Sequence, residues 1–175
     1  MKVKKITELD RISINEFKAA RKTPLIVILD NVRSLNNVGS VFRTSDAFLV
    51  EAVYLCGITA CPPNAEIHKT ALGAENSVDW AYYGETKDAV GELKDKGFVV
   101  CAIEQAERSI ASNDLMLDKT KKYAVVLGNE VKGVRQDIVD LCDCCVEIPQ
   151  YGTKHSLNVS VAAGIVIWEF FKQLG

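Results

Sequence analysis

The chain has 175 residues, of which 48% are hydrophobic and 25% charged, the balance of one ordinary globular domain. No apolar run approaches the ~18 residues of a membrane span, and residues 1–5 lead into polar sequence rather than a signal core. We therefore expect a cytoplasmic protein with no membrane partner. The net charge of −2 argues against nonspecific wrapping of nucleic acid, and we expect no DNA partner.

Strand-like and helix-like segments alternate along most of the chain. Short apolar runs rich in β-branched residues predict buried strands, and segments with helical patterning separate them. This alternation predicts an α/β fold with a mainly parallel sheet flanked by helices. In chain order, the predicted elements are a strand at 25–29, a helix at 38–48, a strand at 52–56, a proline-marked loop at 59–64, a helix at 85–96, strands at 98–103, 123–127 and 145–148, and a helix at 156–173.

Positive charge gathers at the N-terminus. Residues 1–22 contain seven lysines and arginines against three acidic residues, a net charge of +4 that leaves −6 for the rest. Such a segment is compatible with a polyanionic partner, although many are simply solvated helices. We divide the chain into a basic N-terminal extension, residues 1–22, and a single domain, residues 23–175.

The last predicted helix is apolar nearly all round. Leu157, Val161, Ile165, Trp168 and Phe171 mark one face, and further apolar residues occupy the others. A helix of this kind must be buried on several sides. A subunit interface would cover the excess in so short a chain, so we expect a homodimer.

Three predicted loops follow the carboxyl ends of strands, where open α/β sheets bind ligands. The first holds Asn37, which we expect to cap a helix, together with Gly39, which permits close backbone approach, and Arg43. Taken alone, this loop favours a capped helix that carries a surface arginine. The second loop, residues 128–133, has glycines at both ends but lacks the Lys-Ser/Thr of a phosphate loop.

The third loop covers residues 148–160. We expect Ser156 to cap the last helix, and Asn158 needs partners because it begins an otherwise apolar helix. A local capping network would explain both residues equally well. The pair His155-Ser156 does not indicate a hydrolase, since the chain has no G-x-S-x-G elbow.

The cluster formed by Cys142, Cys144 and Cys145 suggests a zinc site at first sight. It lacks the paired C-x2-C spacing, and neither His68 nor His155 stands at a ligand interval from it. We therefore expect no metal, and we interpret the six cysteines as reduced and mostly structural.

Together, the three loops resemble the motifs of the SpoU (TrmH-like) branch of the SPOUT methyltransferases. The pattern N-x-G-x-x-x-R-T occupies residues 37–44, G-N-E occupies 128–130, and I-P with S-L-N-V-S occupies 148–149 and 156–160. The resemblance implies an enzyme that transfers a methyl group from S-adenosylmethionine to a ribose 2'-hydroxyl of structured RNA. It also implies a homodimer and a SPOUT α/β knot, with a trefoil knot near the C-terminus.

The resemblance assigns roles to single residues. Arg43 is the family's catalytic arginine by position, and we expect it to stabilise phosphate and alkoxide, because a free guanidinium is a poor base. The other expected catalytic residues are Asn37, Glu130, Ser156 and Asn158. The expected cofactor-binding residues are Gly128, Ile148 and Leu157, with Glu104 and Gln105 nearby. The expected RNA contacts are Arg33, Arg43, Lys132 and Arg135, with residues 1–22.

The substrate remains open between two kinds of RNA. The segments around Gln150 and residues 97–105 look most like the enzymes that methylate a tRNA D-loop guanosine, and ribosomal RNA is the alternative. Two further readings are a noncatalytic RNA-binding factor on the same scaffold and a methyltransferase acting on a base nitrogen. The intact motif residues argue against the first, and the SpoU-type motifs argue against the second.

Overall fold

The computed structural model describes residues 1–175, apart from the side chain of Ile6. Short 3-10 turns lie at Ile6–Glu8 and Ser112–Asp114. The helices are α1 (Ile14–Ala19), α2 (Leu35–Ala47), α3 (Ala65–Ala71), α4 (Ala74–Ser77), α5 (Thr86–Asp95), α6 (Gln136–Val139) and α7 (Val159–Leu174). The strands are β1 (Thr23–Asp30), β2 (Val50–Cys56), β3 (Asp79–Tyr83), β4 (Phe98–Ile103), β5 (Ile110–Ala111), β6 (Lys122–Leu127) and β7 (Cys144–Glu147).

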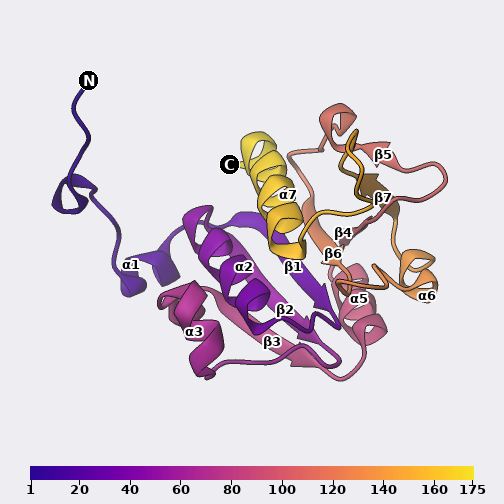
Figure 1. Cartoon of the computed structure of the whole chain (residues 1–175), viewed down its shortest axis with the longest axis horizontal. Helices are drawn as coiled ribbons and strands as arrows, with labels where there is room; N and C mark the ends of the chain where they lie inside the picture. Colours follow the sequence, from indigo (N-terminus) through magenta and orange to yellow (C-terminus); the bar gives the residue numbers. More distant parts are fainter.

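The described strands form one parallel sheet in the order β3-β2-β1-β6-β4-β7-β5. Side chains alternate between its two faces, so Leu25, Val27 and Leu29 of β1 join one hydrophobic core while Ile26 and Ile28 join the other. The first core lies under α2, α3 and α7, and the second lies under α5 and α6 (Figure 1). Burial on both faces explains why these strands read as continuous apolar runs. The predicted α/β fold with a mainly parallel sheet is confirmed, and the trefoil knot stays a prediction.

Both predicted helix caps were wrong. Helix α2 begins at Leu35, three residues earlier than expected, because Ser34 rather than Asn37 accepts the hydrogen bond at its N-terminus. Helix α7 begins at Val159, and its cap is Asn158 rather than Ser156, with the Asn158 side chain accepting from the backbone of the first turn. Because Ser34 caps α2, the side chain of Asn37 is not needed as a cap. It forms hydrogen bonds with Glu130 and Asn158 instead.

The N-terminal segment ends in a short helix that contacts the body of the protein. Ser13 and Glu16 form a reciprocal capping box at the start of α1, and Phe17 is buried. Helix α1 packs against α4, while the residues before it run outward (Figure 1). The boundary at residue 22 stays a prediction. Among the described residues, no helix combines the length and the apolar character needed to span a membrane.

Candidate active site

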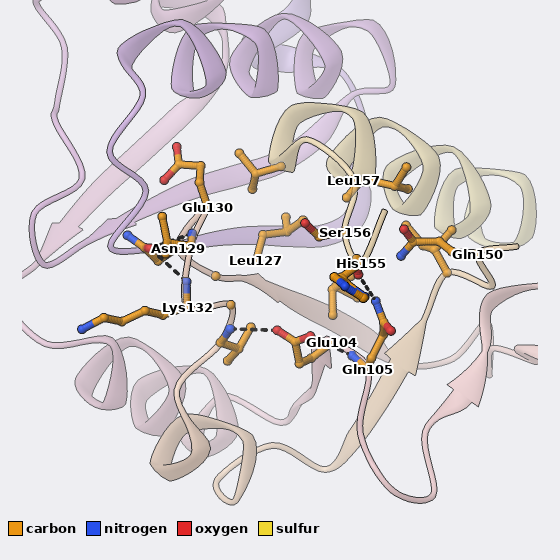
Figure 2. Close-up of a pocket in the computed structure, with 18 residues that line it drawn as sticks. Glu104, Gln105, Leu127, Asn129, Glu130, Lys132, Gln150, His155, Ser156 and Leu157 are labelled. Carbon is orange, nitrogen blue, oxygen red and sulfur yellow. Dashed lines mark hydrogen bonds between the residues drawn. The ribbon is translucent and has the colours of Figure 1, made fainter. Parts of the chain in front are cut away.

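A cavity of about 470 Å³ opens at the carboxyl ends of β4, β6 and β7 (Figure 2). The loop of residues 128–134 and the segment before α7 enclose it. Parallel strands direct their following loops to this edge of the sheet, which is where α/β proteins bind ligands. The cavity combines an apolar wall with a polar rim. The apolar wall consists of Ile103, Leu127, Val131, Val134, Ile148, Leu157, Val159 and Ala162.

The loop after β6 is a tight turn that requires glycine at both ends. A Cβ on Gly128 would collide with the backbone of Gly133 and Val134, and Gly133 adopts a φ of +66°. The N–H of Asn129 donates to the carbonyl of Gly133 at 3.1 Å, and the reverse bond measures 2.9 Å. The backbone groups of Asn129 and Gly133 therefore pair with each other. We expect a ligand to contact other backbone or side-chain groups of this turn.

The Glu130 carboxylate joins this turn to the start of α2. Its Oε1 accepts hydrogen bonds from the backbone N–H of Ser34 at 2.9 Å and from Nδ2 of Asn37 at 3.2 Å. Its Oε2 accepts from the backbone N–H of Arg33 at 3.0 Å. Burial raises the pKa of Glu130, but these donors outweigh burial and hold the pKa below its ordinary value. Glu130 is therefore an ionised anchor at neutral pH.

Asn37 extends the same network to α7. Its Oδ1 accepts a hydrogen bond from Nδ2 of Asn158 at 3.1 Å, and its side chain is well protected, since the residue is 9% exposed. The amide of Asn158 thus caps α7 through its oxygen and reaches Asn37 through its nitrogen. One chain of hydrogen bonds connects the three sequence motifs, from Glu130 through Asn37 to Asn158.

Glu104 and Gln105 lie on the rim, where they brace the two loops that enclose the cavity. Glu104 accepts hydrogen bonds from the backbone N–H of Gln105 at 2.8 Å and of Val134 at 3.0 Å. Gln105 donates from Nε2 to the carbonyl of His155 at 2.7 Å (Figure 2). Both residues line the cavity, and the polar atoms named here are engaged within the protein. Their role in binding a cofactor stays a prediction.

The remaining predicted residues fall into two groups. Gly128, Lys132, Ile148, Ser156 and Leu157 line the cavity. Arg43 lies outside it, exposed on α2, and the side chains of Arg33 and Arg135 are exposed too. Arg135 is engaged by Asp137 through two hydrogen bonds of 3.0 and 2.6 Å.

The sequence analysis missed three kinds of residue at this site. Ser34 and Val134 take part through their backbone N–H groups, which no side-chain pattern reveals. Ile103, Val159 and Ala162 form part of the apolar wall, and their place at the ends of β4 and α7 was the available signal. Asn129, which holds the turn by accepting from the N–H of Val131, lay within the G-N-E motif but received no role.

The cysteines pack within and beside the sheet. Cys101 and Cys144 are register partners on β4 and β7, with their Sγ atoms 3.1 Å apart. Burial raises the pKa of Cys142 to about 12, and its thiol donates to the carbonyl of Ile138. Among the residues that the structure describes, no group of three or more His, Cys, Asp or Glu side chains could hold a metal ion.

Comparison with known proteins identifies the family that this fold and motif network define. The model described as the SpoU rRNA Methylase family matches residues 24–168. The chain belongs to this family, whose members are methyltransferases.

Two sequence relatives show its range. The tRNA (guanosine(18)-2'-O)-methyltransferase of Aquifex aeolicus is 34% identical over 163 residues, covering 91% of this chain and 74% of the relative. The 23S rRNA (guanosine-2'-O-)-methyltransferase RlmB of Nitrosomonas europaea is 34% identical over 171 residues, covering 96% of this chain but 64% of the relative.

Solved structures agree with this placement. The AdoMet-bound rRNA methyltransferase from Sinorhizobium meliloti matches with a TM-score of 0.80 and 27% identity, covering 90% of this chain and 60% of that one. The A. aeolicus TrmH/SpoU tRNA modifying enzyme matches with a TM-score of 0.79 and 30% identity, covering 91% and 81%. The chain thus spans less than two thirds of both the RlmB relative and the S. meliloti enzyme.

Proposed function

We propose that this protein transfers a methyl group from S-adenosylmethionine to a ribose 2'-hydroxyl of structured RNA. The observation that carries the proposal is the hydrogen-bonded chain Glu130–Asn37–Asn158, which joins the three family motifs beside the cavity. Glu130 belongs both to this network and to the lining of the cavity, which supports a ligand site at the motif residues. Two similar relatives are named as guanosine 2'-O-methyltransferases, which supports a guanosine as the target.

The cavity suits S-adenosylmethionine in size and in chemistry. Its volume of about 470 Å³ lies within the usual range for small-molecule sites. The wall of Ile103, Leu127 and Leu157 fits an apolar ring, and the polar rim with Gln150 fits the charged end of the molecule. The bound sulfonium supplies an electrophilic methyl group. The protein's task is then to align the ribose hydroxyl and help it lose a proton.

We infer that Arg43 serves the active site of a partner subunit. It is exposed on α2 and lies outside the cavity of its own chain, while α2 packs against α7. Helix α7 presents Val161, Ile165 and Trp168 to solvent, and Trp168 is 47% exposed. A two-fold dimer through this surface would bury these apolar residues and could bring Arg43 beside the partner's cavity. There, the guanidinium would stabilise the phosphate and the developing alkoxide.

The substrate is a tRNA guanosine in the first instance, with ribosomal RNA as the second candidate. The relatives include both kinds of enzyme at equal identity. The A. aeolicus tRNA enzyme is matched over 74% of its length and the N. europaea RlmB enzyme over 64%, which favours tRNA. The RNA contacts we propose are Arg33, Arg43, Lys132 and Arg135, together with residues 1–22. Action in the cytoplasm, where these RNAs are found, belongs to the same proposal.

Methyl transfer with nucleoside analysis tests the reaction. Radiolabelled S-adenosylmethionine would be incubated with total tRNA and, separately, with ribosomal RNA. We expect 2'-O-methylguanosine in the tRNA digest and no signal with Arg43→Ala, whose affinity for the cofactor stays unchanged. If only ribosomal RNA is methylated, ribosomal RNA rather than tRNA is the substrate. A methylated base instead of a methylated ribose would overturn the proposed chemistry.

Mixed dimers test whether Arg43 acts across the interface. One subunit would carry Arg43→Ala and the other Gly128→Val, which disrupts the turn that lines the cavity because a Cβ on Gly128 meets the backbone of Gly133 and Val134. If Arg43 acts on the partner, the mixed dimer keeps one of its two sites, so we expect about half of the wild-type activity for purified mixed dimers and about a quarter for a random mixture of the two inactive variants. If Arg43 acts in its own chain, the mixture stays inactive.

A further inference from the structure

A second cavity lies apart from the candidate active site. It has a volume of about 480 Å³ and is formed by the loop before α3, by α3 and α4, and by the edge strand β3. The two cavities share no lining residue among those described. This volume is typical of a site for a small molecule or for one unit of a polymer.

Trp80 supplies an aromatic surface in this cavity. It lies on β3, which pairs with β2 on one side only, and 38% of the residue is exposed. Pro62 and Pro63 line the same cavity, which adds further rigid apolar surface. Aromatic rings at the surface of proteins that bind single-stranded nucleic acid serve as stacking platforms for bases. The cavity therefore offers a flat apolar ligand a place to stack.

Polar groups border this aromatic surface. Nδ1 of His68 lies 2.6 Å from Oε1 of Glu75, whose side chain is only 9% exposed. Burial raises the pKa of Glu75, but the hydrogen bond with His68 and nearby backbone groups lower it overall, so the carboxylate is ionised at neutral pH. An ionised carboxylate only accepts, so Nδ1 carries the hydrogen. Nε2 of His68, on a side chain that is 63% exposed, is then the ring nitrogen left for a ligand.

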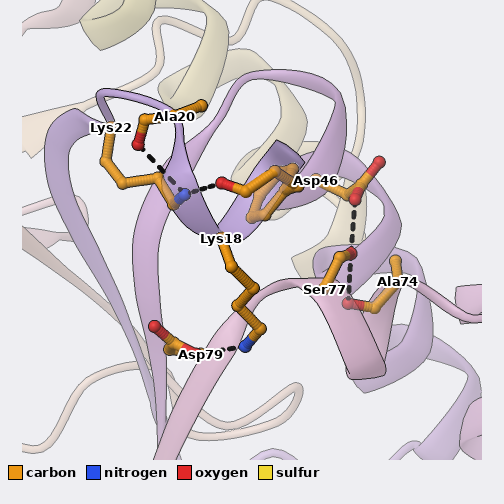
Figure 3. A network of polar contacts seen from close by, with 8 residues as sticks. Lys18, Ala20, Lys22, Asp46, Ala74, Ser77 and Asp79 are labelled. Carbon is orange, nitrogen blue, oxygen red and sulfur yellow. Dashed lines mark hydrogen bonds and ion pairs between the residues drawn. The ribbon is translucent and has the colours of Figure 1, made fainter. Parts of the chain in front are cut away.

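The basic N-terminal segment is attached beside this cavity. Helix α1 packs against α4, which contributes Glu75 and Asn76 to the cavity. Lys18 forms an ion pair with Asp79, the residue directly before Trp80 (Figure 3). Residues 1–22 carry a net charge of +4 on a chain whose remainder carries −6. The basic segment is thus anchored through α1 next to an aromatic cavity, and positive charge beside an aromatic ring suits a nucleic acid chain.

We propose that this cavity is a second RNA subsite, where one unpaired base of the substrate stacks on Trp80 and residues 1–22 contact the flanking phosphates. His68 hydrogen-bonds the edge of the stacked base through Nε2. The proposal rests on the proposed function, because that function makes RNA the polymer. Every base has a stacking face, so the subsite distinguishes unpaired from paired RNA rather than one sequence from another.

Binding of a short fluorescein-labelled RNA, single-stranded or annealed to its complement, tests the subsite. We expect the full-length protein to prefer the single strand, and Trp80→Ala to weaken that binding about tenfold, which is typical for one lost stacking contact. The matched control is Tyr82→Ala, which removes another exposed aromatic ring of β3 from outside the cavity. We expect the control to bind like the wild type, and both variants to bind S-adenosylmethionine normally.

Several results would overturn the subsite. Unchanged RNA binding by Trp80→Ala, or equal weakening by the Tyr82 control, would show that the cavity is not used. Equally tight binding of free guanosine monophosphate would indicate a small-molecule site instead. If Trp80→Ala fails to fold, Trp80→Phe and His68→Ala replace it. We expect each of these variants to weaken binding of the single-stranded RNA about threefold. Wild-type RNA binding by both variants would rule out the subsite. Absence of methyl transfer by the wild type would contradict the proposed function and leave this binding measurement intact.

Discussion

Glu104 accepts a hydrogen bond from the backbone N–H of Val134 at 3.0 Å, so the end of β4 holds the loop that follows β6. The neighbouring residue, Gln105, holds the opposite loop through the carbonyl of His155. Glu104 and Gln105 therefore fix the positions of the two loops that enclose the candidate active site. Their influence on the cofactor acts through the position of these loops.

Removing the Glu104 side chain should loosen the cavity. We expect Glu104→Ala to weaken S-adenosylmethionine binding about tenfold and to lower the free energy of unfolding by about 1–3 kcal/mol, because two backbone N–H groups lose a charged acceptor. Calorimetric titration and urea unfolding would measure the two effects. Glu107→Ala removes an exposed carboxylate three residues away and serves as the control for charge. Equal behaviour of the two variants would contradict the bracing role.

The anchor role of Glu130 predicts a pH-dependent stability. Its folded pKa lies below the ordinary value of 4.5, so the ionised form stabilises the folded state at neutral pH. This stabilisation is present above pH 4.5 and is lost as the pH falls through the folded pKa. At pH 7 we expect Glu130→Gln to be less stable than the wild type by about 1–3 kcal/mol. Urea unfolding from pH 7 to pH 3 should show the difference shrinking, and a constant difference would argue against an ionised anchor.

Asn158 should matter more for stability than Ser156, although both belong to the same motif. Asn158→Ala removes the cap of α7, which costs about 1 kcal/mol, and leaves Oδ1 of Asn37 without its donor. We expect a total loss of about 2 kcal/mol in the free energy of unfolding. Ser156 is exposed, and Ser156→Ala should cost less than about 0.5 kcal/mol. Thermal unfolding of both variants would show which residue caps the helix.

The cysteines should differ in their reactivity. Burial raises the pKa of Cys142 and of Cys56 to about 12, whereas the hydrogen bond with Cys101 lowers the pKa of Cys144. Thiolates are the reactive form, so iodoacetamide at pH 7.5 should modify Cys144 before Cys142. Mass spectrometry of peptides from a time course would give the order. Faster labelling of Cys142 would mean that access rather than the pKa controls the reaction.

The central strands could be predicted from the sequence because both of their faces are buried, which leaves continuous apolar runs at β1, β4 and β6. The edge strand β3 was missed. Its sequence, Asp79–Tyr83, has no continuous buried apolar run, and each of its residues is exposed or half-buried, as in many loops. Helices α3 and α4 were also missed, since seven and four residues are too few to show a helical period.

The motifs predicted much of the candidate site, including the meeting of Asn37, Glu130 and Asn158. They could not predict the position of Arg43 relative to the cavity. The spacing between Asn37 and Arg43 along α2 follows from the sequence. The direction in which the Arg43 side chain points depends on how α2 packs on the sheet. The bracing by Glu104 was also hidden, because its partners are backbone groups.

The order of the strands has a consequence for the growing chain. Strand β1 pairs with β6, which lies almost a hundred residues later in the chain. The side chain of Asn37 accepts a hydrogen bond from Asn158, 121 residues further along. During synthesis, which proceeds at roughly 5–20 residues per second, the first half of the protein emerges from the ribosome without its central neighbour. Its apolar strands must stay apart from other chains for several seconds. A nascent chain that stops before α7 would lack Val159 and Ala162, so the apolar wall of the cavity is completed only when synthesis reaches the last helix.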